Sequence, residues 1–194
     1  MNKKIKWGII GLGKIANKFA EDLQLLTDTE LYAVASRDVE KAEKFSEKYN
    51  SKKFYASYEE LAADAIIDVI YIATPNTFHF ENTMMCLKKG KGVLCEKPLG
   101  INYGEVETMV REAESRNLFL MEGIWTRFIP ATKKLLQILD KKMIGDTLFI
   151  RADFGFKADT NPEGRLYNKK LGGGSLLDIG IYPIYLSLIT LGIP

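Results

Sequence analysis

Gly11-Leu12-Gly13-Lys14-Ile15-Ala16 follows the apolar run Ile5–Ile10 and opens a segment in which apolar residues recur every three or four positions. A Gly-x-Gly-x-x-Ala sequence between a strand and a helix is typical of the turn that binds a dinucleotide's pyrophosphate. Gly11 permits the tight turn, Gly13 lets the pyrophosphate approach the helix N-terminus, and Ala16 lets the helix pack closely on the strand. An ordinary glycine turn is the alternative, but it does not explain this position in the chain. The stretch therefore predicts a Rossmann domain.

The rest of the first 122 residues alternates between short apolar runs and segments with helical spacing. The apolar runs, which we interpret as buried parallel strands, are Ile5–Ile10, Leu31–Ala35, Val69–Ala73, Val93–Cys95 and Leu118–Met121. This alternation predicts βαβ units and an α/β fold, a doubly wound parallel sheet with helices on both faces. Residues 1–122 are therefore expected to form one NAD(P)-binding domain.

The pattern changes after Met121. We predict a helix from Pro130 to about Lys141, a long strand over Thr147–Phe156, and an apolar helix from Leu176 to Leu191. A lone strand leaves its backbone donors and acceptors unpaired. We therefore expect residues 123–194 to form part of a second domain, either because the sequence is a fragment or because another chain completes the domain.

The end of the second predicted strand normally selects the cofactor, because an acidic residue there binds the ribose 2′-hydroxyl of NAD. Here the strand ends at Ser36 and Arg37, and Asp38 follows one position later. Arg37 can pair with a 2′-phosphate while Ser36 donates a hydrogen bond, which favours NADP over NAD. The alternative is a surface arginine, with Asp38 capping the next helix.

Two further motifs follow the predicted strands Val69–Ala73 and Val93–Cys95, at the edge where open α/β sheets bind ligands. The first is Thr74-Pro75-Asn76, with His79 three residues later, and the second is Glu96-Lys97-Pro98. Lys97 is placed to hydrogen-bond a substrate oxygen near the nicotinamide; an exposed loop lysine is the alternative. His79, the only histidine, either contacts cofactor or substrate or has a structural role.

The last predicted helix places Asp178, Tyr182 and Tyr185 on one face, at i, i+4 and i+7. The opposite face is apolar and is expected to pack inward; it comprises Leu177, Ile181, Ile184, Leu188 and Leu191. A tyrosine near a lysine can exchange a proton with a substrate hydroxyl, whereas most helical tyrosines are half-buried packing residues. Pro183 removes one helix hydrogen bond and is expected to disturb the alignment of Tyr182 with Asp178.

Composition excludes several other classes of protein. The net charge of +2 does not indicate binding to nucleic acid or to an anionic membrane. With one histidine and two scattered cysteines, Cys86 and Cys95, the sequence predicts no metal site and no disulfide framework, and the cysteines read as buried structural thiols. No signal-peptide pattern is present, and we expect no apolar stretch to approach the ~20 residues that span a bilayer. We expect a cytoplasmic protein.

Four motifs together resemble the Gfo/Idh/MocA family of oxidoreductases over the whole chain. They are Gly11-Leu-Gly-Lys-Ile-Ala16, Thr74-Pro-Asn76, Glu96-Lys-Pro98 and Gly172-Gly-Gly-Ser-Leu-Leu-Asp-Ile-Gly-Ile-Tyr-Pro183. The segment Glu122-Gly-Ile-Trp-Thr-Arg-Phe-Ile-Pro130 is most similar to the dihydrodiol and D-xylose dehydrogenase branch, which uses NADP. Many members carry histidine at the position of Tyr182, but tyrosine fits this branch. In the family, a large antiparallel sheet builds the second domain, and this chain is expected to supply one strand of it.

The resemblance implies roles for individual residues. Lys97 and Tyr182 would be catalytic, with Asp178 supporting them, and Trp125 and Arg127 would line the substrate pocket unless they are interdomain packing. The expected cofactor-binding residues are Gly11, Gly13, Lys14, Ile15, Ala16, Ser36, Arg37, Thr74, Pro75, Asn76, His79, Glu96 and Lys97.

The sequence as a whole predicts an NADP-dependent oxidoreductase acting on an alcohol or carbonyl carbon of a sugar, polyol or trans-dihydrodiol, and forming a homo-oligomer at full length. A non-catalytic dinucleotide sensor is the alternative, but it would need the glycine turn and not the pair Lys97 and Tyr182. A purely structural module explains neither the glycine turn nor the lysine at the same sheet edge.

Overall fold

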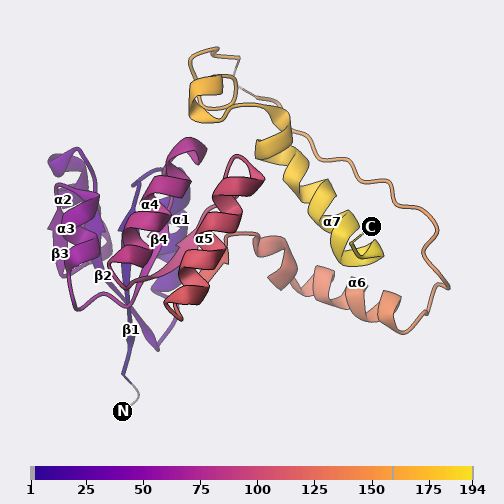
Figure 1. The fold of residues 1–194 in the computed structure, drawn as a ribbon, viewed down its shortest axis with the longest axis horizontal. Helices are drawn as coiled ribbons and strands as arrows, with labels where there is room; N and C mark the ends of the chain where they lie inside the picture. Colours follow the sequence, from indigo (N-terminus) through magenta and orange to yellow (C-terminus); the bar gives the residue numbers. More distant parts are fainter. Residues whose placement is uncertain (1–2, 159, 194) are drawn as a thin grey trace. The chain divides into compact units, whose positions relative to one another are not determined.

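The computed structural model describes residues 3–158 and 160–193, and the chain divides into two units, Met1–Gly123 and Ile124–Pro194 (Figure 1). The strands of the first unit are β1 (Ile5–Ile10), β2 (Thr29–Ala35), β3 (Lys53–Tyr55), β4 (Val69–Ile72), β5 (Gly92–Cys95) and β6 (Leu120–Glu122). Its helices are α1 (Lys14–Leu23), α2 (Val39–Tyr49), α3 (Tyr58–Ala63), α4 (His79–Lys88) and α5 (Tyr103–Ser115), with a 3-10 turn at Asn76–Phe78.

These strands form one six-stranded sheet in the order β3-β2-β1-β4-β5-β6, and each neighbouring pair is parallel. The strand order reverses between β1 and β4, which is the switch point where open α/β sheets bind ligands at the carboxyl ends of the strands. The predicted Rossmann-type fold is confirmed.

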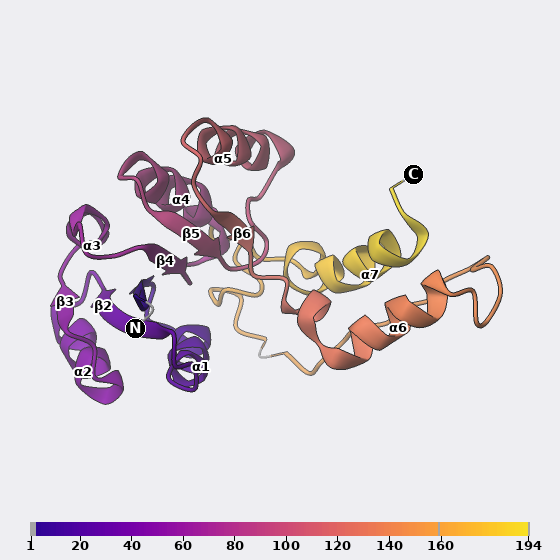
Figure 2. The same ribbon diagram turned by 90° about the horizontal axis from the view of Figure 1, so that it is seen from below.

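Two apolar layers cover the sheet, one on each face. Helices α1 and α2 pack on one face through Ala16, Ala20 and Phe45, which belong to one buried cluster. Helices α3, α4 and α5 cover the other face through a second cluster that includes Leu61 and Met109. Figure 2 shows the two groups of helices on opposite sides of the strands. Alternation along each strand explains the division, because successive side chains point to opposite faces.

The sequence patterns missed two elements, β3 and α3. β3 is a three-residue edge strand whose first two residues are exposed, so it carries no buried apolar run. α3 spans six residues, and Ser57 caps it by accepting a hydrogen bond from the Glu60 amide. Both elements are too short to show a clear period.

The regular secondary structure of the second unit's described residues is all helical. It contains a 3-10 turn at Trp125–Phe128, α6 (Pro130–Asp140), a 3-10 turn at Lys169–Leu171, a π-helical turn at Leu176–Gly180 and α7 (Ile181–Leu191). The strand predicted over Thr147–Phe156 is wrong: this segment has no regular secondary structure, and Leu148 is 93% exposed. Because no strand among the described residues of this unit pairs with it, its β-type pattern has no ladder to join.

The last predicted helix is also corrected. Pro183 has no N–H and cannot complete the α-helical bond to the carbonyl of Ile179, and a π-helical turn precedes it. The apolar face expected to pack inward is largely exposed, since Ile184 is 48% exposed and Leu191 is 53% exposed. We conclude that this stripe has no covering element within the described part of the unit.

The stretch Lys169–Leu191 is long and apolar enough, by length and composition alone, to cross a membrane. The expectation that no stretch approaches this length is therefore wrong. The same stretch begins with two lysines and contains a glycine run and Asp178, which is paired with Arg165. A single such helix is a weak indication, because an apolar helix of a soluble domain passes the same test.

Candidate active site

The glycine turn has the geometry that the sequence predicts. Gly11 lies at φ +83°, and a Cβ there would lie 2.6 Å from the backbone of Ala73 and of Thr74. Only glycine fits this conformation and this close approach to the end of β4. Gly13 caps α1, and a Cβ there would meet nothing within 4 Å. The turn is therefore closed at Gly11 and open at Gly13, the point where a pyrophosphate would meet the helix N-terminus.

The residues that follow β2 differ in exposure and in their hydrogen bonds. Arg37 is exposed, and its guanidinium carbon lies 5.8 Å from the centre of the Phe78 ring, while Ser36 is buried. Asp38 caps α2 by accepting a hydrogen bond from the Lys41 amide at 3.2 Å. The cap at Asp38 and the exposed Arg37 are the features of the alternative interpretation, and they do not by themselves distinguish NADP from NAD.

The Thr74-Pro75-Asn76 motif is buried against the start of α4. Thr74 and Asn76 are 8% and 6% exposed, and the Thr74 hydroxyl accepts a hydrogen bond from the Asn82 side chain at 3.1 Å. His79 is fully buried, and its ring nitrogens lie 2.7 Å from the Pro98 carbonyl oxygen and 2.9 Å from that of Thr74. His79 therefore links the loop that carries Thr74 to the loop that carries Pro98.

The loop after β5 carries Glu96 and Lys97. The Glu96 carboxylate accepts a hydrogen bond from the hydroxyl of Tyr71, a residue of β4, and lies 3.3 Å from the Lys97 amide. Burial, and then the nearby Glu96 charge, raise the pKa of Tyr71, so this phenol remains a donor. The first unit thus brings together the expected residues at the carboxyl ends of β1, β2, β4 and β5.

In the second unit, Asp178 is buried, and its Oδ1 lies 2.7 Å from Nη1 of Arg165. The ring of Tyr182 lies 5.0 Å from that of Phe154, centre to centre. Sequence reasoning missed Arg165, which lies in the polar loop before the glycine run. A buried aspartate usually has a cationic partner. A search for such a partner of Asp178 could therefore have identified Arg165.

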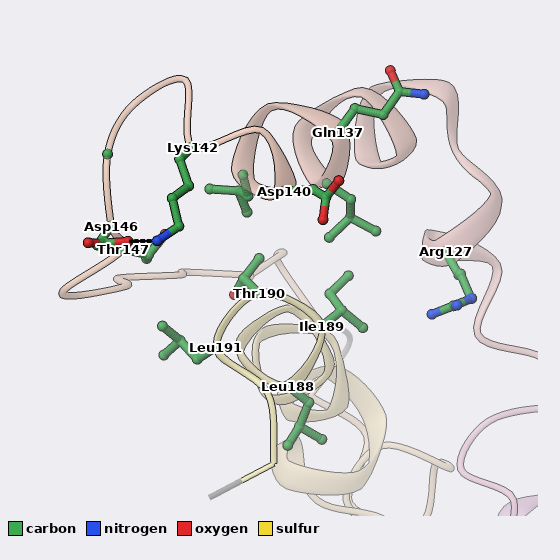
Figure 3. A pocket seen from close by; sticks show the side chains of 13 residues that line it. Arg127, Gln137, Asp140, Lys142, Asp146, Thr147, Leu188, Ile189, Thr190 and Leu191 are labelled. Atoms are coloured by element: carbon green, nitrogen blue, oxygen red, sulfur yellow. Dashed lines mark ion pairs between the residues drawn. The ribbon is translucent and has the colours of Figure 1, made fainter.

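The two residues expected to line a substrate pocket differ in their surroundings. Trp125 is 59% exposed. Arg127 borders an open cavity of about 890 Å³, together with Asp140 of α6 and Leu188 of α7. Figure 3 shows these side chains around the hollow, with the ion pair of Lys142 and Asp146 at its margin.

Tyr185 has a buried hydroxyl without a hydrogen-bond partner among the described residues.

The two cysteines are buried, as expected of structural thiols. Burial raises the pKa of the Cys86 thiol to about 12 and that of Cys95 still further, so neither thiol is poised as a nucleophile. Among residues 3–158 and 160–193, no group of three or more His, Cys, Asp or Glu side chains is placed to hold a metal ion.

A parallel sheet with a glycine turn at its switch point, and motifs at the neighbouring strand ends, defines a dinucleotide-binding protein of the Rossmann class. A family model described as "Oxidoreductase family, NAD-binding Rossmann fold" matches residues 5–124, and the "GFO/IDH/MocA C-terminal domain" matches residues 132–194. The chain belongs to the Gfo/Idh/MocA oxidoreductase family.

Characterised relatives indicate one branch of that family. The chain is 45% identical to the human trans-1,2-dihydrobenzene-1,2-diol dehydrogenase over 190 residues, 97% of this chain and 56% of the relative. It is 46% identical to the enzyme of the same name from Xenopus tropicalis over 179 residues, 91% of this chain and 54% of the relative. The chain thus spans about half the length of these relatives. The resemblance to the dihydrodiol dehydrogenase branch is confirmed.

Solved structures agree with this assignment. A 3-ketoreductase from Actinomadura kijaniata in complex with NADP and TDP-benzene is 32% identical, with a TM-score of 0.90 over 98% of this chain and 58% of its own. An NAD-binding oxidoreductase from Klebsiella pneumoniae is 30% identical, with a TM-score of 0.86 over 97% of this chain and 54% of its own. These similarities support a nicotinamide cofactor for the Rossmann domain.

Proposed function

We propose that this chain carries the cofactor site and the catalytic side chains of an NADP-dependent dehydrogenase acting on adjacent hydroxyls of a diol or sugar. The observation that carries the proposal is the carboxyl edge of the sheet, where the open Gly13 turn, Arg37 and the Lys97 loop belong to one unit. The human relative at 45% identity is named a trans-diol dehydrogenase, and the NADP-complexed neighbour is named a 3-ketoreductase.

The choice of NADP rests on the end of β2. Asp38 is engaged in capping α2, whereas Arg37 is exposed and approaches the face of Phe78. A guanidinium at this position pairs with a 2′-phosphate, and it can stack on the adenine as well. NAD offers no phosphate there and would lose this charge-assisted contact.

The proposed chemistry assigns one task to each side chain. When bound, nicotinamide supplies the hydride acceptor for oxidation of the alcohol carbon. Lys97 donates a hydrogen bond from its ammonium to the reacting oxygen and stabilises the anionic form of that oxygen. Tyr182 removes the hydroxyl proton during oxidation and returns it during reduction. Arg165 fixes the Asp178 carboxylate at the beginning of the helical segment that bears Tyr182.

The test is a substrate panel with NADP and with NAD. A trans-dihydrodiol, D-xylose, other aldoses and inositols are each incubated with this chain and with the longest gene product that contains it, and absorbance of the reduced cofactor is followed. We expect turnover with NADP on at least one vicinal diol. Tight NADPH binding without turnover on any member of the panel would instead favour a dinucleotide sensor.

A further inference from the structure

Glu122 begins the motif that distinguishes this branch, yet none of the roles above uses it. It is the last residue of β6, and β6 pairs with β5 in a register that sets Glu122 opposite Cys95. The next residue, Gly123, donates its amide to the Cys95 carbonyl at 2.7 Å. Glu122 is thereby held beside the loop that leaves β5.

The chain leaves β5 through the turn Lys97–Leu99. Each residue of this turn has a backbone group within hydrogen-bonding distance of a side chain. Glu96 lies 3.3 Å from the Lys97 amide, and His79 lies 2.7 Å from the Pro98 carbonyl. Glu122 Oε1 accepts the Leu99 amide at 2.8 Å. Leu99 is 8% exposed, so without Glu122 its amide would be left in the interior without this acceptor.

The residue that follows Glu122 also fits this arrangement. A Cβ at Gly123 would lie 3.3 Å from the Cys95 carbonyl oxygen and from the Cα of Glu96, and 3.4 Å from Glu96 Oε1. A side chain there would press on the residue that precedes Lys97. Glu122 thus provides a hydrogen-bond acceptor for the Leu99 amide at the end of the turn. Gly123, which has no side chain, leaves space for Glu96 at the start of the turn.

We propose that Glu122 is a positioning residue, which holds the turn bearing Lys97 in place through a charge-assisted hydrogen bond from the Leu99 amide. This inference rests on the proposed function, because its consequence is felt at the cofactor site. Glu122 touches no reacting atom and acts only through the turn.

The electrostatics of the site support a role other than stability. Burial raises the pKa of Glu122; the Leu99 amide and the charges of His79 and Lys97 lower it, and Glu96 raises it. Glu96 is itself hydrogen-bonded to Tyr71. A carboxyl whose pKa is higher in the folded protein than in the unfolded chain favours folding at low pH, and that contribution is lost as the pH rises through the folded value. Above its folded pKa, Glu122 therefore does not stabilise the fold through its charge.

The test compares Glu122→Gln with the unchanged chain of 194 residues. Glutamine keeps the size and an oxygen acceptor for Leu99 but removes the charge. The matched control is Glu105→Gln, because Glu105 Oε2 also accepts a backbone amide, that of Ile101 at 3.1 Å, but at an exposed position. NADPH dissociation constants are measured by fluorescence from about pH 5 to 8, and the melting temperature of each protein is measured at about pH 7.

We expect Glu122→Gln to weaken NADPH binding about three- to tenfold at about pH 8, the difference between a charge-assisted and a neutral hydrogen bond. The ratio of the two dissociation constants should approach one as the pH falls, because a protonated Glu122 and a glutamine are equivalent in charge. The titration of the ligand's own phosphate cancels in this ratio. The melting temperature should be equal or higher in the variant, and Glu105→Gln should change neither quantity.

Two results would overturn the inference while leaving the proposed function intact. One is a ratio that stays at one throughout the pH range. The other is a lower melting temperature in Glu122→Gln with no pH-dependent change in affinity, which would make Glu122 a purely structural residue. Absence of saturable NADPH binding by the unchanged chain would instead contradict the proposed function itself.

Discussion

Arg165 and Asp178 form an ion pair that joins the polar loop of the second unit to the helical segment bearing Tyr182. Their Nη1 and Oδ1 atoms are 2.7 Å apart, and the Asp178 side chain is 11% exposed whereas that of Arg165 is 50% exposed. The pair therefore lies at the boundary between buried and solvent-exposed positions. There a charged hydrogen bond contributes more than it does on an open surface.

A double-mutant cycle tests this pair. Arg165→Gln and Asp178→Asn are made singly and together, and the free energy of unfolding of each protein is measured with urea. We expect a coupling energy of about 1 kcal/mol, within the usual range for contacting charged residues. Additive losses would show that the two side chains do not support each other in solution.

Cofactor selection is tested at the end of β2. Arg37→Ala should reduce the preference for NADPH over NADH by ~1–3 kcal/mol, the range for hydrogen bonds to charged groups, because the 2′-phosphate loses its cation. Arg111→Ala is the control, since that arginine is exposed on α5 and pairs with Glu107 at 2.8 Å. Titration of each protein with both cofactors measures the effect. Equal affinities for NADPH and NADH in the unchanged chain would refute the assignment.

The acid stability of the first unit should depend on Asp64. Burial raises the pKa of this carboxyl, but hydrogen bonds from Lys53, Tyr55 and the Ile66 amide outweigh that effect and lower it to about 2. A carboxyl with a lowered pKa favours folding above its unfolded value, about 4, and this contribution is lost as the pH falls through the folded value.

Melting temperatures measured from about pH 5 down to about pH 2 test this expectation. The unchanged chain should lose stability over that window more steeply than Asp64→Asn does. The control is Asp22→Asn, which removes an exposed partner of Lys18 within α1 and should follow the unchanged chain. Parallel curves for Asp64→Asn and the unchanged chain would rule out Asp64 as the source of acid sensitivity.

Catalysis should depend on Tyr182 and Lys97 as a unit. Tyr182→Phe removes only the hydroxyl and should lower kcat ~10²–10⁴-fold, the usual contribution of a positioned acid–base group, with NADPH affinity little changed. Lys97→Met should lower kcat similarly and should also weaken NADPH binding, because the turn bearing Lys97 belongs to the proposed cofactor site. The double variant should lose far less of kcat than the product of the two losses. Steady-state kinetics on the longest gene product would measure this. Near-normal turnover by Tyr182→Phe would mean that another group moves the proton.

The first unit was largely predictable because burial on both faces of a parallel sheet leaves a strong sequence signal. The predicted bounds of the strand Ile5–Ile10 match those observed. Gly11 was assigned to a tight turn, and its φ of +83° is a backbone conformation that favours glycine. The short edge strand Lys53–Tyr55 escaped because it buries too little to show a period.

The second unit was harder to predict because its segments depend on partners that the sequence pattern does not supply. Thr147–Phe156 alternates like a strand, but with no neighbouring strand among the described residues it has no ladder to join. Pro183 correctly signalled an irregular helix, although not the π-helical turn that precedes it. The hydrogen bonds of His79 and Glu122 could not be predicted from the sequence, because each joins segments that are distant along the chain.

The central claim is that the carboxyl edge of the sheet binds the pyrophosphate of NADPH at the Gly13 turn. A matched pair of variants tests it, because Gly11→Ala would place a Cβ 2.6 Å from backbone atoms whereas Gly13→Ala would meet no protein atom within 4 Å. Gly11→Ala should therefore lower the melting temperature strongly. Gly13→Ala should lower it less, because the φ of −90° at Gly13 suits any residue, although alanine is a weaker helix N-cap than glycine.

The most direct measurement is a fluorescence titration of the purified 194-residue chain and of Gly13→Ala with NADPH. We expect saturable binding by the unchanged chain and at least ~10-fold weaker binding by Gly13→Ala, a loss of ~1.4 kcal/mol or more, with a melting temperature above that of Gly11→Ala. Saturable binding that is equally tight in Gly13→Ala, or no binding by the unchanged chain, would contradict it.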